Sequence, residues 1–209
     1  KFDLKDISED EFRKYSYQVK QAIENNDELA NDYPNQYEIL FAVALLHFKN
    51  KLADLCILEV GMGGKFDATN AIPAPILCAF PKIDLDHTKF LGDSSAKIAA
   101  EKAAIIKPGT GYVVSVPQKS DVKKVLETAA KKAKVKIFKT IEVNDAGIDK
   151  AKKFRKISSS QPGLKTAKLA MLGKYQLENA SVAASCALAL NELGLKIDNS
   201  SIKSGLQNT

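Results

Sequence analysis

The sequence predicts an α/β protein with a doubly wound, mostly parallel sheet flanked by helices. Between residues 54 and 138, short apolar runs alternate with helical patterns of about ten to fifteen residues. One of these runs, Asp54–Val60, carries a single carboxylate, Glu59, near its end and then breaks into glycines. A buried strand has this form when it delivers a side chain into a site at its carboxyl edge.

The first part of the chain is predicted to form two helices. Ser8-Glu9-Asp10-Glu11 has capping-box form, and apolar residues follow it at helical spacing, so we expect a helix over about residues 9–25. A second, more buried helix ends near Lys51, and its pattern residues are Tyr37, Leu40, Phe41, Ala44, Leu45 and Phe48. His47 has no partner at metal-ligand spacing, which favours a core or boundary residue over a ligand.

Alternating strands and helices follow. The expected strands are 54–60, 76–80, 112–116 and 135–138, and the expected helices are 95–107, 120–134, 174–193 and 198–206. Between residues 139 and 170 the pattern loosens into short lysine-rich pieces, which we interpret as a peripheral hairpin region.

Composition limits the class of protein. A chain of 209 residues with 45% apolar content suits one medium-sized domain or most of a larger one. It contains no apolar run long enough to span a membrane and no secretory leader, so we expect no membrane partner. Cys56, Cys78 and Cys186 sit in apolar runs without CxxC spacing, which predicts buried thiols in a reducing compartment.

The net charge of the chain is weak evidence about the kind of molecule that the protein binds. The formal net charge of +6 arises from 31 basic and 25 acidic residues, and lysines are dense between Lys119 and Lys174. Such an excess suits an anionic small molecule, although lysine-rich helix faces are most often only solvated surface. No basic-aromatic module is present, so we expect no nucleic-acid partner.

Glu59 and the glycines after it are the most specific arrangement. A carboxylate at the end of a buried strand needs a partner, which is either the backbone amides of a neighbouring loop or a magnesium ion beside nucleotide phosphates. The glycines of Gly61–Gly64 let the backbone approach a ligand closely. They fail as a dinucleotide fingerprint because the third glycine would fall at Phe66, which disfavours a dehydrogenase, and no GxxxxGK[ST] phosphate loop occurs in the chain.

Two further residues have possible ligand chemistry. His87 lies between Asp86 and Thr88 after an expected strand and is either a metal ligand or a loop histidine bonded to its neighbours. Lys102 shares a helix face with Ile98 and Ile106. It either extends past an apolar patch to solvent or is partly buried, in which case a lowered pKa leaves a neutral amine for covalent chemistry.

Four segments, in order, resemble one family: Leu58–Asn70, Leu85–Gly92, Ile98–Gly109 and Leu172–Ala180. They closely resemble folylpolyglutamate synthase and dihydrofolate synthase, which belong to the Mur ligase superfamily of ATP-dependent amide-forming enzymes. The resemblance implies a three-part architecture, of which residues 1–209 are most of the central ATPase domain. The P-loop segment that precedes this domain and the C-terminal domain would lie outside the chain.

The resemblance also implies roles for individual residues. Glu59 and His87 would bind a magnesium ion together with a carbamylated Lys102, and the same three residues would carry catalysis. The adenine of ATP would lie near Gln176 and Asn179. The residues that line the folate side or order the glycine loop would be Asp67, Thr69 and Asn70.

The implied reaction joins L-glutamate to a carboxylate of folate or dihydropteroate through an acyl phosphate, with ATP and Mg²⁺ as cofactors. We expect a monomer in the cytoplasm, with the mitochondrion as the other possible compartment. The chain departs from the family pattern at Phe80–Asp84, which replaces a shorter segment, at Ala104, which replaces glycine, and at Lys65, which replaces arginine. A non-catalytic nucleotide-binding or interaction module therefore remains the alternative.

Overall fold

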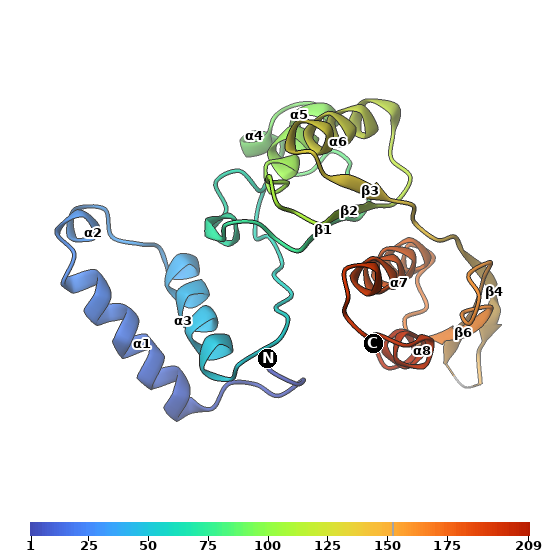
Figure 1. Ribbon diagram of the computed structural model, residues 1–209, viewed down its shortest axis with the longest axis horizontal. Helices are drawn as coiled ribbons and strands as arrows, with labels where there is room; N and C mark the ends of the chain where they lie inside the picture. The colour runs from blue at the N-terminus through green and yellow to red at the C-terminus, as the bar shows by residue number, and fades with distance from the viewer. Residues whose placement is uncertain (152) are drawn as a thin grey trace. The chain divides into compact units, whose positions relative to one another are not determined.

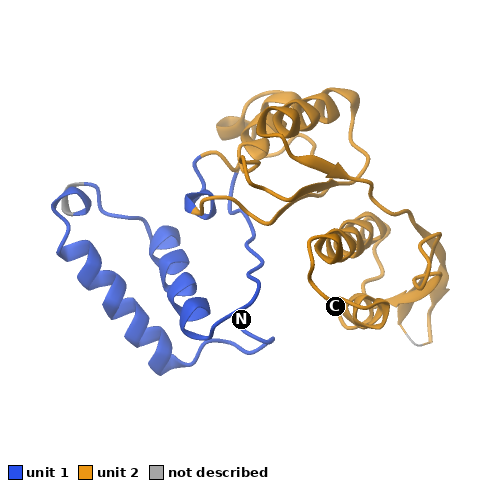
Figure 2. Cartoon of the chain, viewed as in Figure 1, with its two compact units in different colours: residues 1–62, 66–71 blue, residues 63–65, 72–209 orange. Residues whose placement is uncertain are grey.

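The computed structural model describes residues 1–151 and 153–209, and the chain divides into two compact units (Figure 2). Unit 1 comprises residues 1–62 and 66–71, and unit 2 comprises residues 63–65 and 72–209. The boundary between the units passes through the glycine loop, which we define as residues 61–64. No described helix is long and apolar enough to cross a membrane.

Unit 1 is a helical hairpin (Figure 1). It contains α1 (Glu9–Glu24), the short α2 (Asp27–Asn31), α3 (Gln36–Asn50) and a 3-10 turn, η1 (Ala68–Ala71). The Ser8 side chain caps α1 as the sequence predicts, by accepting a hydrogen bond from the Glu11 amide. An ion pair of 2.7 Å joins Glu11 at the start of α1 to Lys51 at the end of α3, so the two helices run antiparallel.

The buried face of α3 differs from the prediction. Val43 and His47 face the α1 residues Tyr15, Val19 and Ile23, whereas the predicted inward residues Tyr37 and Leu40 are exposed. The reason is that α3 is apolar on most of its circumference, so periodicity did not single out one face. His47 is a core residue, as predicted, and its ring contacts those of Phe2, Tyr15 and Phe48.

Unit 2 contains the predicted parallel sheet. Its strands β1 (Leu77–Phe80), β2 (Tyr112–Ser115) and β3 (Lys136–Phe138) lie in the order β1-β2-β3. The helices α4 (Thr88–Leu91), α5 (Ser95–Ala103) and α6 (Ser120–Ala133) connect them, and α5 and α6 pack on one face through Ile98, Val122 and Leu126. The doubly wound prediction is thus confirmed, because α7 (Gln176–Glu192) covers the other face.

Three strands form a second, antiparallel sheet in the order β4-β5-β6: β4 (Val143–Asp149), β5 (Phe154–Ser159) and β6 (Thr166–Leu169). The prediction of antiparallel pieces in this region is correct for the described residues, but the sheet is not merely peripheral. It shares a core with α7 and α8 (Asn199–Gln207) that includes Ile157, Leu169, Ala184 and Leu206. Helix α7 therefore packs against both sheets (Figure 1).

The expected strand 54–60 is not formed. The described chain has no strand pairing there, and Leu55, Ile57 and Glu59 are exposed. Cys56 is consequently exposed as well, contrary to the prediction, whereas burial raises the pKa of Cys78 to about 12 and that of Cys186 to about 11. Apolar composition indicated a strand, but a strand also needs a neighbouring strand to satisfy its backbone, and unit 1 supplies none among its described residues.

Candidate functional site

Asp67 organises the first half of the glycine loop. One of its carboxylate oxygens accepts hydrogen bonds from the amides of Gly61 (2.9 Å) and Met62 (3.0 Å), and the other accepts from the amide (2.9 Å) and hydroxyl (2.6 Å) of Thr69. Partial burial alone would raise the pKa of Asp67, but these hydrogen bonds outweigh burial and hold the pKa below its ordinary value. Of the two roles left open for Asp67, ordering the loop is the one its contacts support.

Thr69 and Asn70 follow Asp67 in the 3-10 turn η1. Thr69 is buried, and its hydroxyl is committed to Asp67. The backbone amide of Asn70 donates to the carbonyl of Asp67. Asp67, Thr69 and Asn70 are thus brought together in one turn, while their contribution to a folate site stays a prediction.

The second half of the glycine loop packs against α5. A side chain on Gly64 would lie 2.7 Å from the carbonyl oxygen of Glu101 and 3.1 Å from Cα of Lys102. Gly63 adopts a left-handed φ of +69° beside Leu91. Gly64 therefore allows a close approach to the backbone of α5, next to the half-buried Lys102 in the last turn of that helix.

His87 lies in the segment that leaves the carboxyl end of β1. Its side chain is 54% exposed, its Nε2 is 3.6 Å from the Asp86 carboxylate, and its φ of 48° is left-handed. His87 immediately precedes α4, which packs against α5, the helix that carries Lys102.

The segment before His87, which departs from the family pattern, has its own anchors. The side chain of Gln118 donates to the Pro81 carbonyl (2.8 Å) and accepts from the Ile83 amide (3.1 Å). Lys119 pairs with Asp84 at 2.7 Å and lowers the pKa of that carboxyl. Sequence reasoning missed Gln118 and Lys119, because their partners lie 35 to 37 residues away in the chain.

The two residues expected near adenine lie at the start of α7. The side chain of Asn179 donates to the side-chain oxygen of Gln176 at 2.9 Å. Asn179 is exposed and Gln176 is half-buried. The structure therefore brings this pair together on the first turn of one helix, as their spacing of three requires.

The predicted magnesium ligands are divided between the units, with Glu59 in unit 1 and His87 and Lys102 in unit 2. Within residues 1–151 and 153–209, no three His, Cys, Asp or Glu side chains form a cluster able to hold a metal. The predicted magnesium ligands would not appear among such clusters, because the third predicted ligand, Lys102, is a lysine. The assignment of one ion to these three side chains stays a prediction.

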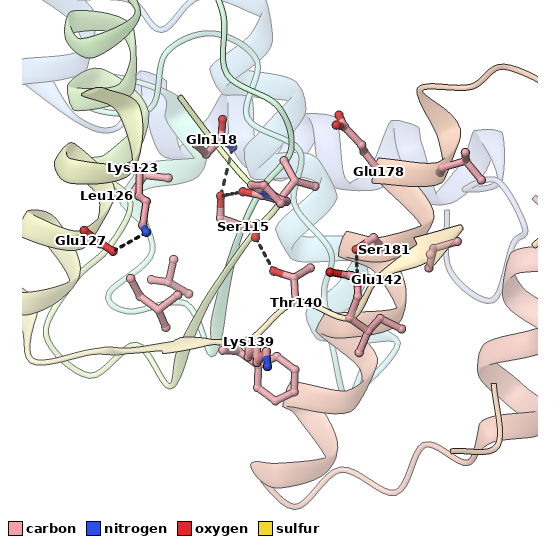
Figure 3. A pocket seen from close by; sticks show the side chains of 18 of the residues that line it. Ser115, Gln118, Lys123, Leu126, Glu127, Lys139, Thr140, Glu142, Glu178 and Ser181 are labelled. Carbon is pink, nitrogen blue, oxygen red and sulfur yellow. Dashed lines mark hydrogen bonds and ion pairs between the residues drawn. The ribbon is translucent and has the colours of Figure 1, made fainter. Parts of the chain in front are cut away.

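A pocket of about 640 Å³ opens elsewhere in unit 2, around the carboxyl ends of β2 and β3 (Figure 3). It lies between α6, β4 and α7, and Lys123 and Glu127 form an ion pair at its side. On the opposite side, the Ser181 hydroxyl donates to the Ile141 carbonyl. The lining residues that the structure describes include none of the predicted site residues.

Comparison with known proteins identifies the family. The chain belongs to the Mur ligase middle domain family, whose model matches residues 6–187. It is 33% identical to a folylpolyglutamate synthase of Arabidopsis thaliana over 190 residues, which are 90% of this chain and 30% of that protein. It is 28% identical to the dihydrofolate synthase/folylpolyglutamate synthase of Bacillus subtilis, over 96% of this chain and 47% of that protein.

Solved structures agree on the fold. Folylpolyglutamate synthase from Thermotoga maritima superposes with a TM-score of 0.83 at 27% identity, covering 98% of this chain and 46% of that one. An FPGS–AMPPCP–folate complex superposes with a TM-score of 0.81 at 23% identity, covering 93% of this chain and 48% of that one. The chain thus spans about half the length, or less, of the relatives it matches.

Proposed function

We propose that this chain is the central, ATP-handling part of a ligase that joins L-glutamate to a carboxylate of folate or dihydropteroate. The observation that carries the proposal is the family match over residues 6–187, within which the motif residues follow the family's order. Relatives named folylpolyglutamate synthase and dihydrofolate synthase supply the reaction class, and a structural neighbour in complex with AMPPCP and folate supplies the ligand classes.

We assign the following roles to the residues of this chain. Gln176 and Asn179 bind the adenine, and Asp67 keeps the glycine loop in shape for the anionic substrates. The γ-phosphoryl group of ATP passes to the substrate carboxylate, giving ADP and an acyl phosphate. The amine of glutamate then attacks the acyl carbon, phosphate leaves, and the amide forms with loss of a proton.

A carboxylate and a carbamate would supply oxygen ligands of the kind that a magnesium ion prefers. His87 is half-exposed beside the Asp86 carboxylate, and Lys102 is half-buried next to the glycine loop. We assign the ion to Glu59, His87 and Lys102, with Lys102 carrying a carbamate, because a carbamate converts an amine into an anionic oxygen ligand. When bound, magnesium would reduce the repulsion between the two anionic substrates.

The proposal extends to the domain, the oligomeric state, the compartment and the partners of the protein. We place these 209 residues in the central domain of the three-part architecture and take the whole protein to be a cytoplasmic monomer without a nucleic-acid or membrane partner. The test of this domain assignment is the coding sequence before Lys1. A Gly-Lys-Ser or Gly-Lys-Thr phosphate loop there supports the ligase, and its absence supports the non-catalytic module.

Two variants of the whole protein test the site. Glu59→Gln and Lys102→Ala should each lower turnover by about two orders of magnitude or more, because each would remove a ligand of the proposed magnesium ion, whose charge would stabilise phosphoryl transfer. Circular dichroism should show an unchanged fold. Near-normal turnover in both variants would refute the site assignment.

A further inference from the structure

Arg155 on β5 is a buried cation, only 4% exposed. The chain contains just one other arginine, Arg13, and uses lysine at every other basic position. Burying a guanidinium group is costly unless its donors are paired. An arginine at this position in a lysine-rich segment therefore indicates that the planar, multi-donor group is required rather than the charge alone.

The contacts of Arg155 lead to the loop before α7. Its Nε donates to the Leu172 carbonyl at 3.0 Å, one terminal nitrogen donates to the same oxygen, and the other pairs with the Asp145 carboxylate on β4. Asp145 also accepts the Gly147 amide at 2.9 Å, and its pKa is lowered by that amide, by Arg155 and by the nearby charge of Lys174. Leu172 belongs to this loop, which comprises residues 172–175, so the pair Arg155–Asp145 holds the loop at the Leu172 carbonyl.

This loop sets the position of the first turn of α7. Tyr175, the N-cap residue, makes no capping hydrogen bond with its side chain. Instead, the amides of Gln176 and Leu177 donate to the carbonyls of Gly173 and Lys174, each at 3.1 Å. The start of the helix is therefore held by the loop backbone, and a displacement of the loop would move Gln176.

We propose that Arg155 is a positioning residue for nucleotide binding: by fixing the Leu172 carbonyl, it holds the first turn of α7 so that Gln176 and Asn179 meet the adenine. The proposal rests on the proposed function, in which these two residues bind ATP. A lysine could pair with Asp145 but has no fork with which to bind the Leu172 carbonyl through two nitrogens at the same time.

A second anchor of α7 offers a matched control. The fully buried Ser185 hydroxyl accepts the Ile141 amide at 2.9 Å, about two turns after Asn179 on the same helix. Ser185→Ala removes a buried hydrogen bond between α7 and the segment before β4. It leaves the contacts of the 172–175 loop in place.

The test compares steady-state kinetics of the whole protein for Arg155→Met, Arg155→Lys, Ser185→Ala and Gln176→Ala, at a temperature where each variant is folded by circular dichroism. Both Arg155 variants should raise the KM for ATP about tenfold and change kcat by less than about twofold, because the loss is one of ground-state nucleotide binding. Ser185→Ala should lower the melting temperature and leave KM unchanged. Where Arg155→Met does not fold, Arg155→Lys, which keeps a charge opposite Asp145, carries the test with the same expectation.

The outcomes separate the two proposals. A raised KM for Gln176→Ala together with an unchanged KM for the Arg155 variants would overturn the positioning role and leave the nucleotide site intact. An equal rise in KM for Ser185→Ala would also overturn it, because a general loosening of α7 would then suffice. An unchanged KM for Gln176→Ala would contradict the assignment of the adenine site to α7, and with it the positioning role of Arg155.

Discussion

Two loops that adjoin predicted site residues, the glycine loop and the loop of residues 172–175, are each held by one charged side chain, but over different sequence distances. Asp67 holds the first half of the glycine loop through amides that lie within six positions of it in the chain. Arg155, which lies on strand β5, holds the loop before α7 through the carbonyl of Leu172, 17 residues further along the chain. Asp67 is partly exposed, whereas Arg155 is buried.

The difference shows how each anchor depends on the rest of the fold. The Asp67 anchor is contained in one short motif, so it needs little beyond local turn formation. The Arg155 anchor exists only after β4, β5 and β6 have paired and α7 has packed on them. Loss of the counter-charge should therefore cost more free energy at the distant anchor than loss of a hydrogen bond at the local one, because water cannot reach the buried guanidinium.

The largest effect is expected at the distant anchor. Asp145→Ala should lower the free energy of unfolding more than any of the other variants, because it leaves the Arg155 guanidinium buried without a counter-charge. Arg155→Met should cost less, about 1 kcal/mol, because it removes the buried guanidinium charge itself and leaves only the partly exposed Asp145 carboxylate behind. Urea denaturation of the two variants measures the difference, and a larger cost for Arg155→Met would contradict this ranking.

An intermediate effect is expected in the second half of the glycine loop. Gly64→Ala should cost about 2 kcal/mol, because the new methyl group would lie 2.7 Å from the Glu101 carbonyl oxygen, and backbone there cannot easily move. Gly205→Ala in α8 is the matched control, since nothing lies within 4 Å of its Cβ position. That control should stabilise the protein by up to about 1 kcal/mol. Equal melting temperatures for the two variants would show that Gly64 is not close-packed.

The smallest effect is expected at the local anchor. Asp67→Asn should cost about 1 kcal/mol at pH 7, because water can reach the exposed Gly61 and Met62 and replace part of the lost bonding. The folded-state pKa of Asp67 lies below its ordinary value of 3.8, so its stabilisation is complete above that pH and is lost as the pH falls through the folded-state value.

Melting temperatures measured from pH 7 down to pH 3 check this sign. The gap between the wild type and Asp67→Asn should stay constant to about pH 5 and then narrow. A gap that widens on acidification would mean that burial, and not the hydrogen bonds, dominates at Asp67.

Local patterns predicted most helices and the parallel strands, because each has a strong period or an end signal of its own. They failed at Asp54–Val60, where composition alone cannot supply the neighbouring strand. Periodicity also predicted the wrong buried face for α3, because this helix is apolar on most of its circumference. Periodicity identifies an element, but only its long-range partners decide which side is buried.

The same limit applies to the site. The motif around Asp67 could be identified from the sequence because its partners are local. Gln118, Lys119 and Arg155 could not be assigned, because their partners lie 10 to 37 residues away. One available signal was the use of arginine, not lysine, at position 155 within a lysine-rich segment.

The proposed ligase activity is tested by the mass of the product formed by the whole protein with ATP, isotope-labelled L-glutamate and either folate or dihydropteroate. We expect a product heavier by one labelled glutamate residue, with one ADP released per amide formed and no product from Lys102→Ala. ADP release that is independent of the acceptor and of glutamate, or no amide with either acceptor, would contradict the proposed activity.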